Sequence, residues 1–302
     1  MTTNFGKVKV IGLGGAGSNF IKYLMSKSIK DIEVIAANTD KDSLKKLEER
    51  FKIPVIRFGH NLDLNDGAKG DPEIGLMAAR DSYDELKKVL KGSDIIFIRT
   101  GMGGGTGSGA SIVVAEIARK IGAITIALVS MPFYFEGPKR KKVAEDWFEK
   151  LRQKVDGVAI LPNDILLKNQ SKNKGFQSVL QEGECYFEDI IKVLTYSLKQ
   201  NRKFLLNFFK TENSCFIGAG HDWGIDGLKN GVIKAIESLT SLNNVKIEDL
   251  THVLILISRK EIQDNENIQF IDELLREITV DVMWVEDAQL ENDEVRSVVI
   301  GA

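Results

Sequence analysis

The sequence predicts an α/β fold, in which a domain built on a doubly wound parallel sheet is joined by a long central helix to a smaller α/β domain. Three observations lead to this prediction. Short apolar runs alternate with amphipathic stretches over the first two-thirds of the chain, which is the pattern of strands and helices in a parallel sheet. A long helical pattern follows at 178–199. Beyond about residue 200, a shorter second series of strands and helices begins.

The first predicted domain covers residues 1–177. Its apolar runs predict strands at 7–13, 32–37, 53–57, 94–100, 123–130 and 157–161. The stretches between these runs carry apolar residues at helical spacing and predict helices at 17–28, 41–50, 73–91, 108–121 and 139–155. Each strand is therefore followed by a crossover that returns the chain to the same sheet, as in a doubly wound fold.

The central helix, 178–199, follows a polar loop and leads into the second predicted domain, 200–302. Apolar runs in that domain predict strands at 214–219, 251–258, 280–285 and 294–300, with helices at 224–241 and 265–278. The 302 residues are 43% hydrophobic and 28% charged, which is enough apolar material to bury a core.

Composition narrows the class of protein. A formal charge of -2, from 41 basic and 43 acidic residues, gives no field that would favour nucleic acid or an anionic membrane as the main partner. Cys185 and Cys215 are too few for a disulfide framework, and neither they nor the three histidines have the spacing of metal ligands. No apolar stretch reaches the roughly 20 residues that span a bilayer, and the start of the chain has no signal-peptide pattern. We expect a cytoplasmic protein without a metal site.

The first motif is the run VIGLGGAGSN at 10–19, in which a strand enters a glycine-rich turn and then a helix. Glycines let backbone amides approach phosphate oxygens, and a helix N-terminus adds unpaired N–H donors and a favourable dipole. The spacing Gly12-x-Gly14-x-x-Gly17 also fits the dinucleotide fingerprint of Rossmann-type enzymes. By itself, this motif does not distinguish a phosphate site from an ordinary strand–helix turn.

A second glycine-rich motif favours a phosphate site over an ordinary strand–helix turn. The strand at 94–100 runs into GMGGGTGSG at 101–109, with six glycines in nine positions before another helix. Glycines at this density lose much conformational entropy on folding, which favours a second phosphate cradle over a linker. The run has no lysine, so it is not a Walker loop. The anion would be held by backbone amides and by the hydroxyls of Thr106 and Ser108.

The run GMGGGTGSGA, preceded by DIIFI, resembles the signature motif of the tubulin/FtsZ superfamily, which contains the bacterial cell division GTPases. Other family motifs follow in the same order along the chain. The similar segments are GLGGAGSN at 12–19, ANTD at 37–40, GAKGDPEIG at 67–75, MPFYFEG at 131–137 and LPND at 161–164. The similarity is strong to about residue 165 and weaker beyond it.

The resemblance implies that the protein binds GTP or GDP, with Mg²⁺ accompanying GTP. Phosphate contacts carried over to this sequence are Gly14, Gly15, Ala16, Gly17, Ser18 and Asn19 in the first loop, and Gly103, Gly104, Gly105, Thr106, Gly107 and Ser108 in the second. Further expected nucleotide contacts are Asn38 and Asp40 in the ANTD segment, Glu136 at the ribose and Arg140 near the nucleotide.

Two residues are expected to recognise the base. By resemblance, Asn163 of the LPND segment would read guanine, together with an acid early in the central helix. Asp189 is the best candidate for that acid, and Glu188 or a shift in register remains open. A carboxylate suits this role because it accepts hydrogen bonds from guanine N1–H and N2–H₂ but meets the wrong pattern on adenine.

A loop expected for hydrolysis is missing. In the family, subunits stack head to tail, and an NxDxxD loop from the next subunit supplies acids that position the attacking water. This chain reads QNRKFLLNFFKTE at 200–212, where Glu212 is the sole acid and a weak candidate for a base. We therefore assign no catalytic residue beyond that candidate and expect weak or absent intrinsic GTP hydrolysis.

The expected partners are other copies of this chain or a conventional FtsZ, joined head to tail in filaments. The sequence stops at Ala302, directly after a predicted strand, and lacks the disordered linker and terminal peptide of conventional FtsZ. We therefore expect no direct membrane contact through such a C-terminal peptide.

Two alternatives to a GTP-binding filament protein remain. The first is a Rossmann-type, dinucleotide-dependent oxidoreductase built on the fingerprint at 12–17. Against it, Asn38 stands where a ribose-binding acid is expected, and the second glycine loop has no role. The second is a nucleotide-free interaction module on the same fold, which the two glycine loops argue against.

Overall fold

The computed structural model of the chain describes residues 6–27, 29–62, 67–168, 176–212, 214–224, 226–261, 268–275 and 278–302. The polar loop predicted before the central helix lies largely outside these residues. The described chain forms two compact units, an N-terminal unit of residues 6–184 and a C-terminal unit of residues 185–302. The boundary between them falls inside the helix α8 (Phe176–Thr211), which contains the predicted central helix.

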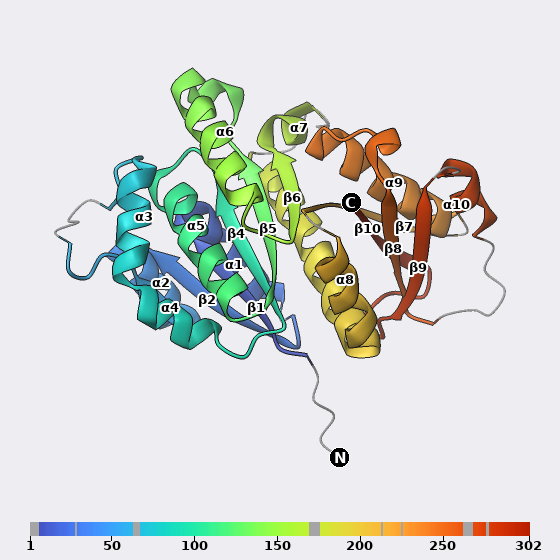
Figure 1. The fold of residues 1–302 in the computed structure, drawn as a ribbon, viewed down its shortest axis with the longest axis horizontal. Helices are drawn as coiled ribbons and strands as arrows, with labels where there is room; N and C mark the ends of the chain where they lie inside the picture. Colours follow the sequence, from blue (N-terminus) through green and yellow to red (C-terminus); the bar gives the residue numbers. More distant parts are fainter. Residues whose placement is uncertain are drawn as a thin grey trace, which may run out of the picture. The chain divides into compact units, whose positions relative to one another are not determined.

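The N-terminal unit is built on a parallel sheet in the order β3-β2-β1-β4-β5-β6 (Figure 1). The six strands fall where the apolar runs predict them. They are β1 (Val8–Leu13), β2 (Ile32–Asn38), β3 (Val55–Arg57), β4 (Ile95–Gly101), β5 (Ile124–Met131) and β6 (Gly157–Pro162). Strands β1 and β4 lie at the centre of this sheet, and nearly all of their residues are buried. The predicted α/β fold with a doubly wound sheet is confirmed.

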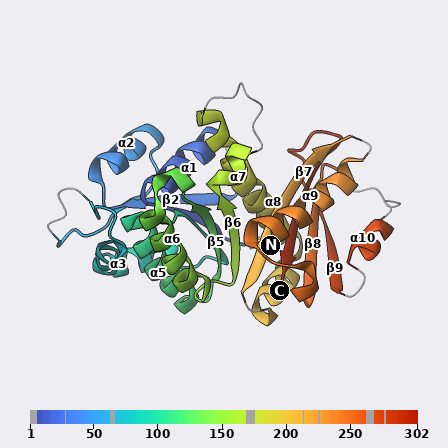
Figure 2. The same cartoon turned by 90° about the horizontal axis from the view of Figure 1, so that it is seen from above.

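Helices cover both faces of this sheet. Figure 2 shows α1 (Gly14–Lys27) and α2 (Lys41–Phe51) on one side, and α3 (Pro72–Asp81), α5 (Gly105–Lys120) and α6 (Pro138–Arg152) on the other. The burial of α5 explains its composition. Thirteen of its residues are buried, and eight of them are Gly, Ala or Ser, which let neighbouring backbones approach closely.

One predicted helix proves to be two. The stretch predicted as 73–91 breaks at Ser82 into α3 and α4 (Tyr83–Leu90). The residue before the break, Asp81, is bound to another segment of the chain. Its carboxylate accepts hydrogen bonds from the backbone and side chain of Asn61, at 3.0 and 2.8 Å. Apolar spacing continues across Ser82 and neither proline nor glycine marks the site, so the sequence pattern gives no sign of the break.

The C-terminal unit has a mixed sheet in the order β7-β10-β8-β9. β10 (Glu294–Gly301) is antiparallel to both β7 (Cys215–Trp223) and β8 (His252–Arg259), whereas β8 and β9 (Thr279–Glu286) are parallel. Helix α9 (Gly227–Asn243) packs against β7 and β10, and α10 (Gln269–Leu274) is short. The core of this unit consists mainly of aliphatic side chains, including Val232, Leu239, Ile255, Ile257 and Val299.

Helix α8 extends further than predicted. It begins near the expected start, but after a break at Asn201, with φ −142° and ψ 65°, helical structure resumes and reaches Thr211. The Asn201 side chain accepts a hydrogen bond from the Phe204 amide at 3.3 Å, as an N-cap residue does. Leu205, Phe208 and Phe209 of this second segment are buried.

Among the described residues, no helix combines the length and apolarity of a transmembrane span.

Replacing Gly109 by alanine should destabilise the protein strongly. A methyl group at this position of α5 would overlap the backbone of α3 at Pro72 and Leu76, so the two helices would have to separate. Overpacking of this kind costs about 1–3 kcal/mol, and more where backbone must move. Urea denaturation measures the loss. Gly122→Ala is the matched control because its methyl group would meet open space, so its loss of about 1–2 kcal/mol would come from the left-handed backbone (φ 80°) alone.

Candidate nucleotide site

The two glycine loops meet where the strand order reverses. From β1 the chain continues to β2 on one side, and from β4 to β5 on the other, while β1 and β4 pair with each other. Leu13 at the end of β1 is opposite Thr100 near the end of β4, so the loops that follow both strands leave the same edge of the sheet. In open α/β sheets, such a switch point is where ligands bind.

Some glycines of the loops are required by contacts within the protein. Gly14 has a left-handed φ of 65°. A Cβ there would lie 3.1 Å from the amide nitrogen of Gly107, so the first loop packs directly on the second. Gly107 is close to the end of β4, because its Cβ would lie 2.7 Å from the carbonyl oxygen of Gly101. These glycines therefore hold the two loops together.

Gly15 and Gly104 have no such packing role. A Cβ at either position would have no heavy atom within 4 Å, and neither residue has a positive φ. Gly15 is exposed and lies in the first turn of α1, whereas Gly104 caps α5 without a side-chain hydrogen bond. The backbone is thus bare toward open space at the N-termini of two helices, which is the geometry of an anion site.

Two further predicted segments reach the second glycine loop. The hydroxyls of Thr39 and Thr106 are 2.7 Å apart and share a hydrogen bond, so the ANTD segment is attached to the second loop. A Cβ on Gly105 would lie 2.7 Å from the Cβ of Ala68 and 2.8 Å from the carbonyl oxygen of Asp71. The GAKGD segment therefore also packs against this loop.

Beside the first glycine loop, the N-terminal unit contains a cavity of about 920 Å³, a volume in the usual range for ligand pockets; no residue of the second loop, 101–109, lines it. Five of the predicted nucleotide contacts line it, namely Ala16, Asn19, Glu136, Arg140 and Asn163. They come from α1, from the 3₁₀ turn Tyr134–Glu136 (η1), from α6 and from the start of α7 (Asn163–Lys168). Segments that are distant in the sequence are thus brought together as the motifs predict.

Sequence analysis missed several charged residues of the cavity. Lys22, Arg50, Arg99 and Glu184 line it in addition to Arg140 and Glu136, which gives four cations and two carboxylates. The balance favours an anionic ligand. Arg99 could have been noticed in the sequence, because it is the single charged residue of the strand IIFIRTG.

Glu136 and Arg140 form a fixed pair at the cavity. Arg140 Nη1 lies 3.0 Å from Glu136 Oε2, while Glu136 Oε1 accepts a hydrogen bond from the Phe133 amide at 2.8 Å. Arg140 also packs on the second glycine loop, since a Cβ on Gly103 would lie 2.8 Å from its Cγ. The predicted ribose contact, Glu136, is therefore oriented by the turn that contains it.

Within the described ranges, no three His, Cys, Asp or Glu side chains gather as metal ligands.

Other predicted contacts have structural tasks and do not line the cavity. Asp40 caps α2 by accepting from the amides of residues 42 and 43, and Asn38 is buried with its side-chain oxygen toward the Asp40 amide. Ser108 is buried and accepts a hydrogen bond from the Gly103 amide at 3.0 Å, which closes the second loop on itself. Ser18 and Gly17 are buried in α1.

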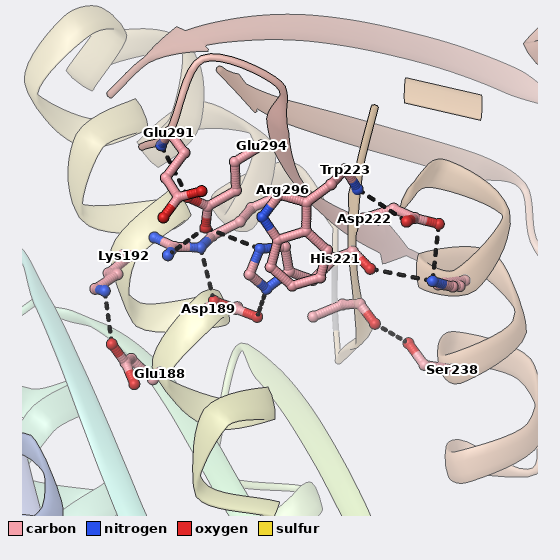
Figure 3. A network of polar contacts seen from close by, with 12 residues as sticks. Glu188, Asp189, Lys192, His221, Asp222, Trp223, Ser238, Glu291, Glu294 and Arg296 are labelled. Atoms are coloured by element: carbon pink, nitrogen blue, oxygen red, sulfur yellow. Dashed lines mark hydrogen bonds and ion pairs between the residues drawn. The ribbon is translucent and has the colours of Figure 1, made fainter. Parts of the chain in front are cut away.

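Asp189 is not among the residues that line the cavity. It is buried in the C-terminal unit, where its carboxylate is 3.0 Å from Arg296 Nε and 3.4 Å from His221 Nδ1 (Figure 3). Glu188, the predicted substitute, is paired with Lys192 at 2.6 Å. The acid of α8 that lines the cavity is Glu184, five residues earlier and about 140° around the helix from Asp189. Of the acids near the start of the central helix, the cavity lining therefore includes Glu184 and neither Asp189 nor Glu188.

The residues in contact with Asp189 also contact Glu294. Arg296 Nη2 also contacts Glu294 at 2.7 Å, and His221 Nε2 lies 2.8 Å from the same carboxylate. Burial acts to raise the pKa of Glu294, but the Glu291 amide, Arg296 and His221 together bring it below its ordinary value. These contacts account for Asp189 as a structural residue of the C-terminal unit.

The segment at 200–212, where the sequence places the expected hydrolysis loop, contains one acid, Glu212. Arg202 and Lys203 are exposed, Leu205 is buried, and Glu212 lies 3.1 Å from His252 Nδ1. His252 Nε2 is in turn 3.0 Å from Asp281. Glu212 is thus within hydrogen-bond distance of His252 at the end of α8.

Comparison with known proteins agrees with this geometry. Residues 7–171 match the model of the Tubulin/FtsZ family, GTPase domain. The chain is 34% identical over 292 residues to cell division protein FtsZ 1 of Pyrococcus furiosus, which covers 94% of this chain and 77% of the relative. It is 46% identical over 165 residues to cell division protein FtsZ of Buchnera aphidicola, which covers 55% of this chain but only 42% of that protein.

Solved structures are similar over almost the whole chain. An FtsZ mutant from M. jannaschii superposes with a TM-score of 0.83 at 29% identity, covering 98% of this chain and 91% of that one. An FtsZ dimer from M. jannaschii, solved empty, gives 0.81 at 30% identity and covers 100% and 89%. CetZ1 from Haloferax volcanii, at 19% identity, shares the fold with a TM-score of 0.74.

Proposed function

Because this chain belongs to the tubulin/FtsZ family, we propose that it is an FtsZ-like cytoskeletal protein that binds GTP or GDP beside its two glycine loops and assembles into head-to-tail filaments. The observation that carries this proposal is the bare backbone of Gly15 and Gly104, at a parallel switch point and next to a cavity with four cations.

The residues around the site fit a nucleotide. The amides from Gly14 to Asn19 and from Gly103 to Ser108 would hold the phosphates, and Thr106 keeps the second loop in place through Thr39. Glu136 would accept from the ribose hydroxyls, with Arg140 fixing its orientation. Mg²⁺, when it accompanies GTP, would neutralise phosphate charge.

For the base we propose Asn163 and Glu184. Both line the cavity, in contrast to Asp189, and together they offer an amide and a carboxylate to the edge of a purine. A carboxylate accepts from the N1–H and N2–H₂ groups of guanine, whereas adenine has an acceptor at N1 and would leave the carboxylate unpaired. The pair therefore favours guanine nucleotides.

The proposal that the protein assembles into filaments rests on relatives that this chain matches over only part of their length. The chain spans 42% and 50% of the length of the FtsZ relatives from Buchnera aphidicola and Azotobacter vinelandii. A related FtsZ from M. jannaschii was solved as a dimer, which supports self-association of this chain or association with a conventional FtsZ. Sedimentation of the protein with GTP tests this part. A GTP-dependent pellet, alone or with a conventional FtsZ, is expected, and absence of both would contradict assembly.

Base choice should be strong. We expect GDP to bind at least about a hundredfold more tightly than ADP, because buried polar groups that lose their partners discriminate strongly between bases. Isothermal titration calorimetry with both nucleotides measures the ratio. Glu184→Ala should reduce it while keeping the phosphate contacts. Equal affinity of the wild-type protein for GDP and ADP would contradict the assignment of the base site.

A further inference from the structure

Arg99 is a buried cation that the proposed nucleotide contacts leave without a role. It lies on β4, its side chain is 4% exposed, and the preceding residues Ile96, Phe97 and Ile98 are completely buried. A buried charge is costly unless it is paired and hydrogen-bonded. A guanidinium in the central strand of the sheet, at the wall of the cavity, therefore calls for a specific partner.

The structure fixes this guanidinium on several sides. Arg99 Nη1 donates to the carbonyl oxygen of Thr100 at 2.7 Å and to the Ser130 hydroxyl at 3.2 Å. The guanidinium lies 5.5 Å from the centroid of the Phe20 ring. Arg99 Nη2 points to Glu184, with both carboxylate oxygens at 3.4 Å. The cation is thus held by its own strand and its neighbours before any ligand arrives.

Glu184 is the partner, and its contact with Arg99 is long. The carboxylate is 15% exposed, and the two contacts of 3.4 Å leave lone pairs on both oxygens for stronger donors. Burial raises the pKa of Glu184, and Arg99 acts against that rise. The other charged residues around the cavity are Lys22, Arg50, Glu136 and Arg140, and among the described residues only Arg99 is recorded in ion-pair contact with Glu184.

We propose that Arg99 is a positioning residue for base recognition, which holds Glu184 ionised and directed into the cavity so that its free lone pairs select guanine. This inference rests on the proposed nucleotide site. Arg99 would act through Glu184, in the way that a charged neighbour sets the orientation and charge of a recognition group.

The relative affinities for guanine and xanthine nucleotides depend on whether Glu184 is ionised. Guanine presents donors at N1 and N2, which suit an ionised carboxylate. Xanthine has a carbonyl oxygen in place of the N2 amine, which suits a protonated carboxyl that donates a hydrogen bond. Preference between GDP and XDP therefore reports whether Glu184 carries its proton.

The test compares GDP and XDP binding by calorimetry at pH 5.5 and pH 8 in the wild-type protein and in Arg99→Met. The wild type should prefer GDP at both pH values. In Arg99→Met the pKa of Glu184 should rise further because burial is no longer opposed, so GDP affinity falls as the pH decreases through that pKa. The xanthine base itself loses a proton in this pH range, equally for both proteins, so we expect the GDP:XDP affinity ratio of this variant to fall at least about tenfold more than the wild-type ratio between pH 8 and pH 5.5.

Controls separate positioning from a loss of fold. Arg99→Lys keeps the charge and should retain a flatter pH profile than Arg99→Met, although it cannot reproduce the planar contacts. Thermal melting checks that each variant is folded. Glu184→Gln should prefer XDP at both pH values, because the amide donates a hydrogen bond whatever the pH.

Two results would overturn the inference. The first is a folded Arg99→Met protein whose GDP:XDP ratio matches the wild type at both pH values, since Arg99 would then have only a structural role. The second is an unchanged ratio in Glu184→Gln, which decides the question even if Arg99→Met fails to fold. Failure of the wild-type protein to bind any guanine nucleotide is a separate outcome, because it removes the proposed function itself.

Discussion

The double variant Gly15→Ala/Gly104→Ala is expected to lose about a hundredfold or more in affinity for GDP while remaining folded. Each new methyl group would project into the open space above bare backbone, where the phosphates are proposed to lie. Loss of one charge-assisted hydrogen bond per loop, at about 1.5 kcal/mol each, corresponds to this change. Calorimetric titration with GDP measures it.

The control for this prediction uses a glycine outside the site. Gly122→Ala introduces a methyl group into equally open space beyond the end of α5, so it should lower stability but leave GDP affinity unchanged. The double variant should melt within a few degrees of the wild type, because neither position has a positive φ or a close neighbour. Wild-type affinity in the folded double variant would contradict the phosphate site.

The purified protein is expected to release phosphate from GTP about 10²–10⁴ times more slowly than a conventional FtsZ, because residues 200–212 do not contain the acids of an NxDxxD loop that we propose to position the attacking water. Lys203 and Phe204 occupy the segment after the break at Asn201, and Glu212 is paired with His252. Steady-state phosphate release at saturating GTP gives the rate for the protein alone.

A mixture with a conventional FtsZ of the same cell tests the partner role. A partner with an intact NxDxxD loop would complete the nucleotide site of this chain, whereas this chain docked onto a partner's nucleotide would leave that GTP uncleaved. The protein should then act as a stabilising or capping subunit in mixed filaments. Glu212→Gln in the protein alone is the matched control. Brisk turnover by the wild type that Glu212→Gln removes would show that Glu212 replaces the missing acids.

Most of the fold could be predicted from the sequence because β1, β4 and β5 are buried runs and each is followed by a helix with apolar residues at helical spacing. The sequence pattern could not predict the breaks within helices, because these breaks depend on tertiary contacts. The break at Ser82 coincides with the tether from Asp81 to Asn61, and the helix beyond Asn201 packs apolar side chains that local spacing alone does not assign to a partner.

The site could be predicted in part for the same reason. The glycine loops could be recognised in the sequence, because runs of glycine occur where backbone atoms must pack closely against other atoms. Asn163 and Glu136, which line the cavity, were predicted from their motifs. Glu184 was missed because a helix rotates its side chains by about 100° per residue, so an uncertain register cannot identify the acid that faces the cavity. Arg99 was missed because its meaning depends on Glu184, which is 85 residues away in sequence.

The structure also bears on the oxidoreductase alternative. Strand order β3-β2-β1-β4-β5-β6 is shared with Rossmann-type enzymes, so topology alone does not separate the two classes. The end of β2 separates them better. Asn38, the residue at the end of β2, is an amide that is buried and turned toward the Asp40 amide, and Asp40 is engaged through Oδ1 in capping α2. The second glycine loop, which an oxidoreductase would not need, packs directly on the first.

The central claim is that the cavity beside the glycine loops holds a guanine nucleotide, and nucleotide analysis of the purified protein tests it most directly. The protein would be denatured, the released small molecules separated by anion-exchange chromatography, and the stripped protein titrated with GDP, ADP and NAD. We predict GDP or GTP in the released fraction and tight rebinding of GDP alone. Release of a nicotinamide dinucleotide, or no nucleotide together with no binding of GDP at millimolar concentration, would contradict the account.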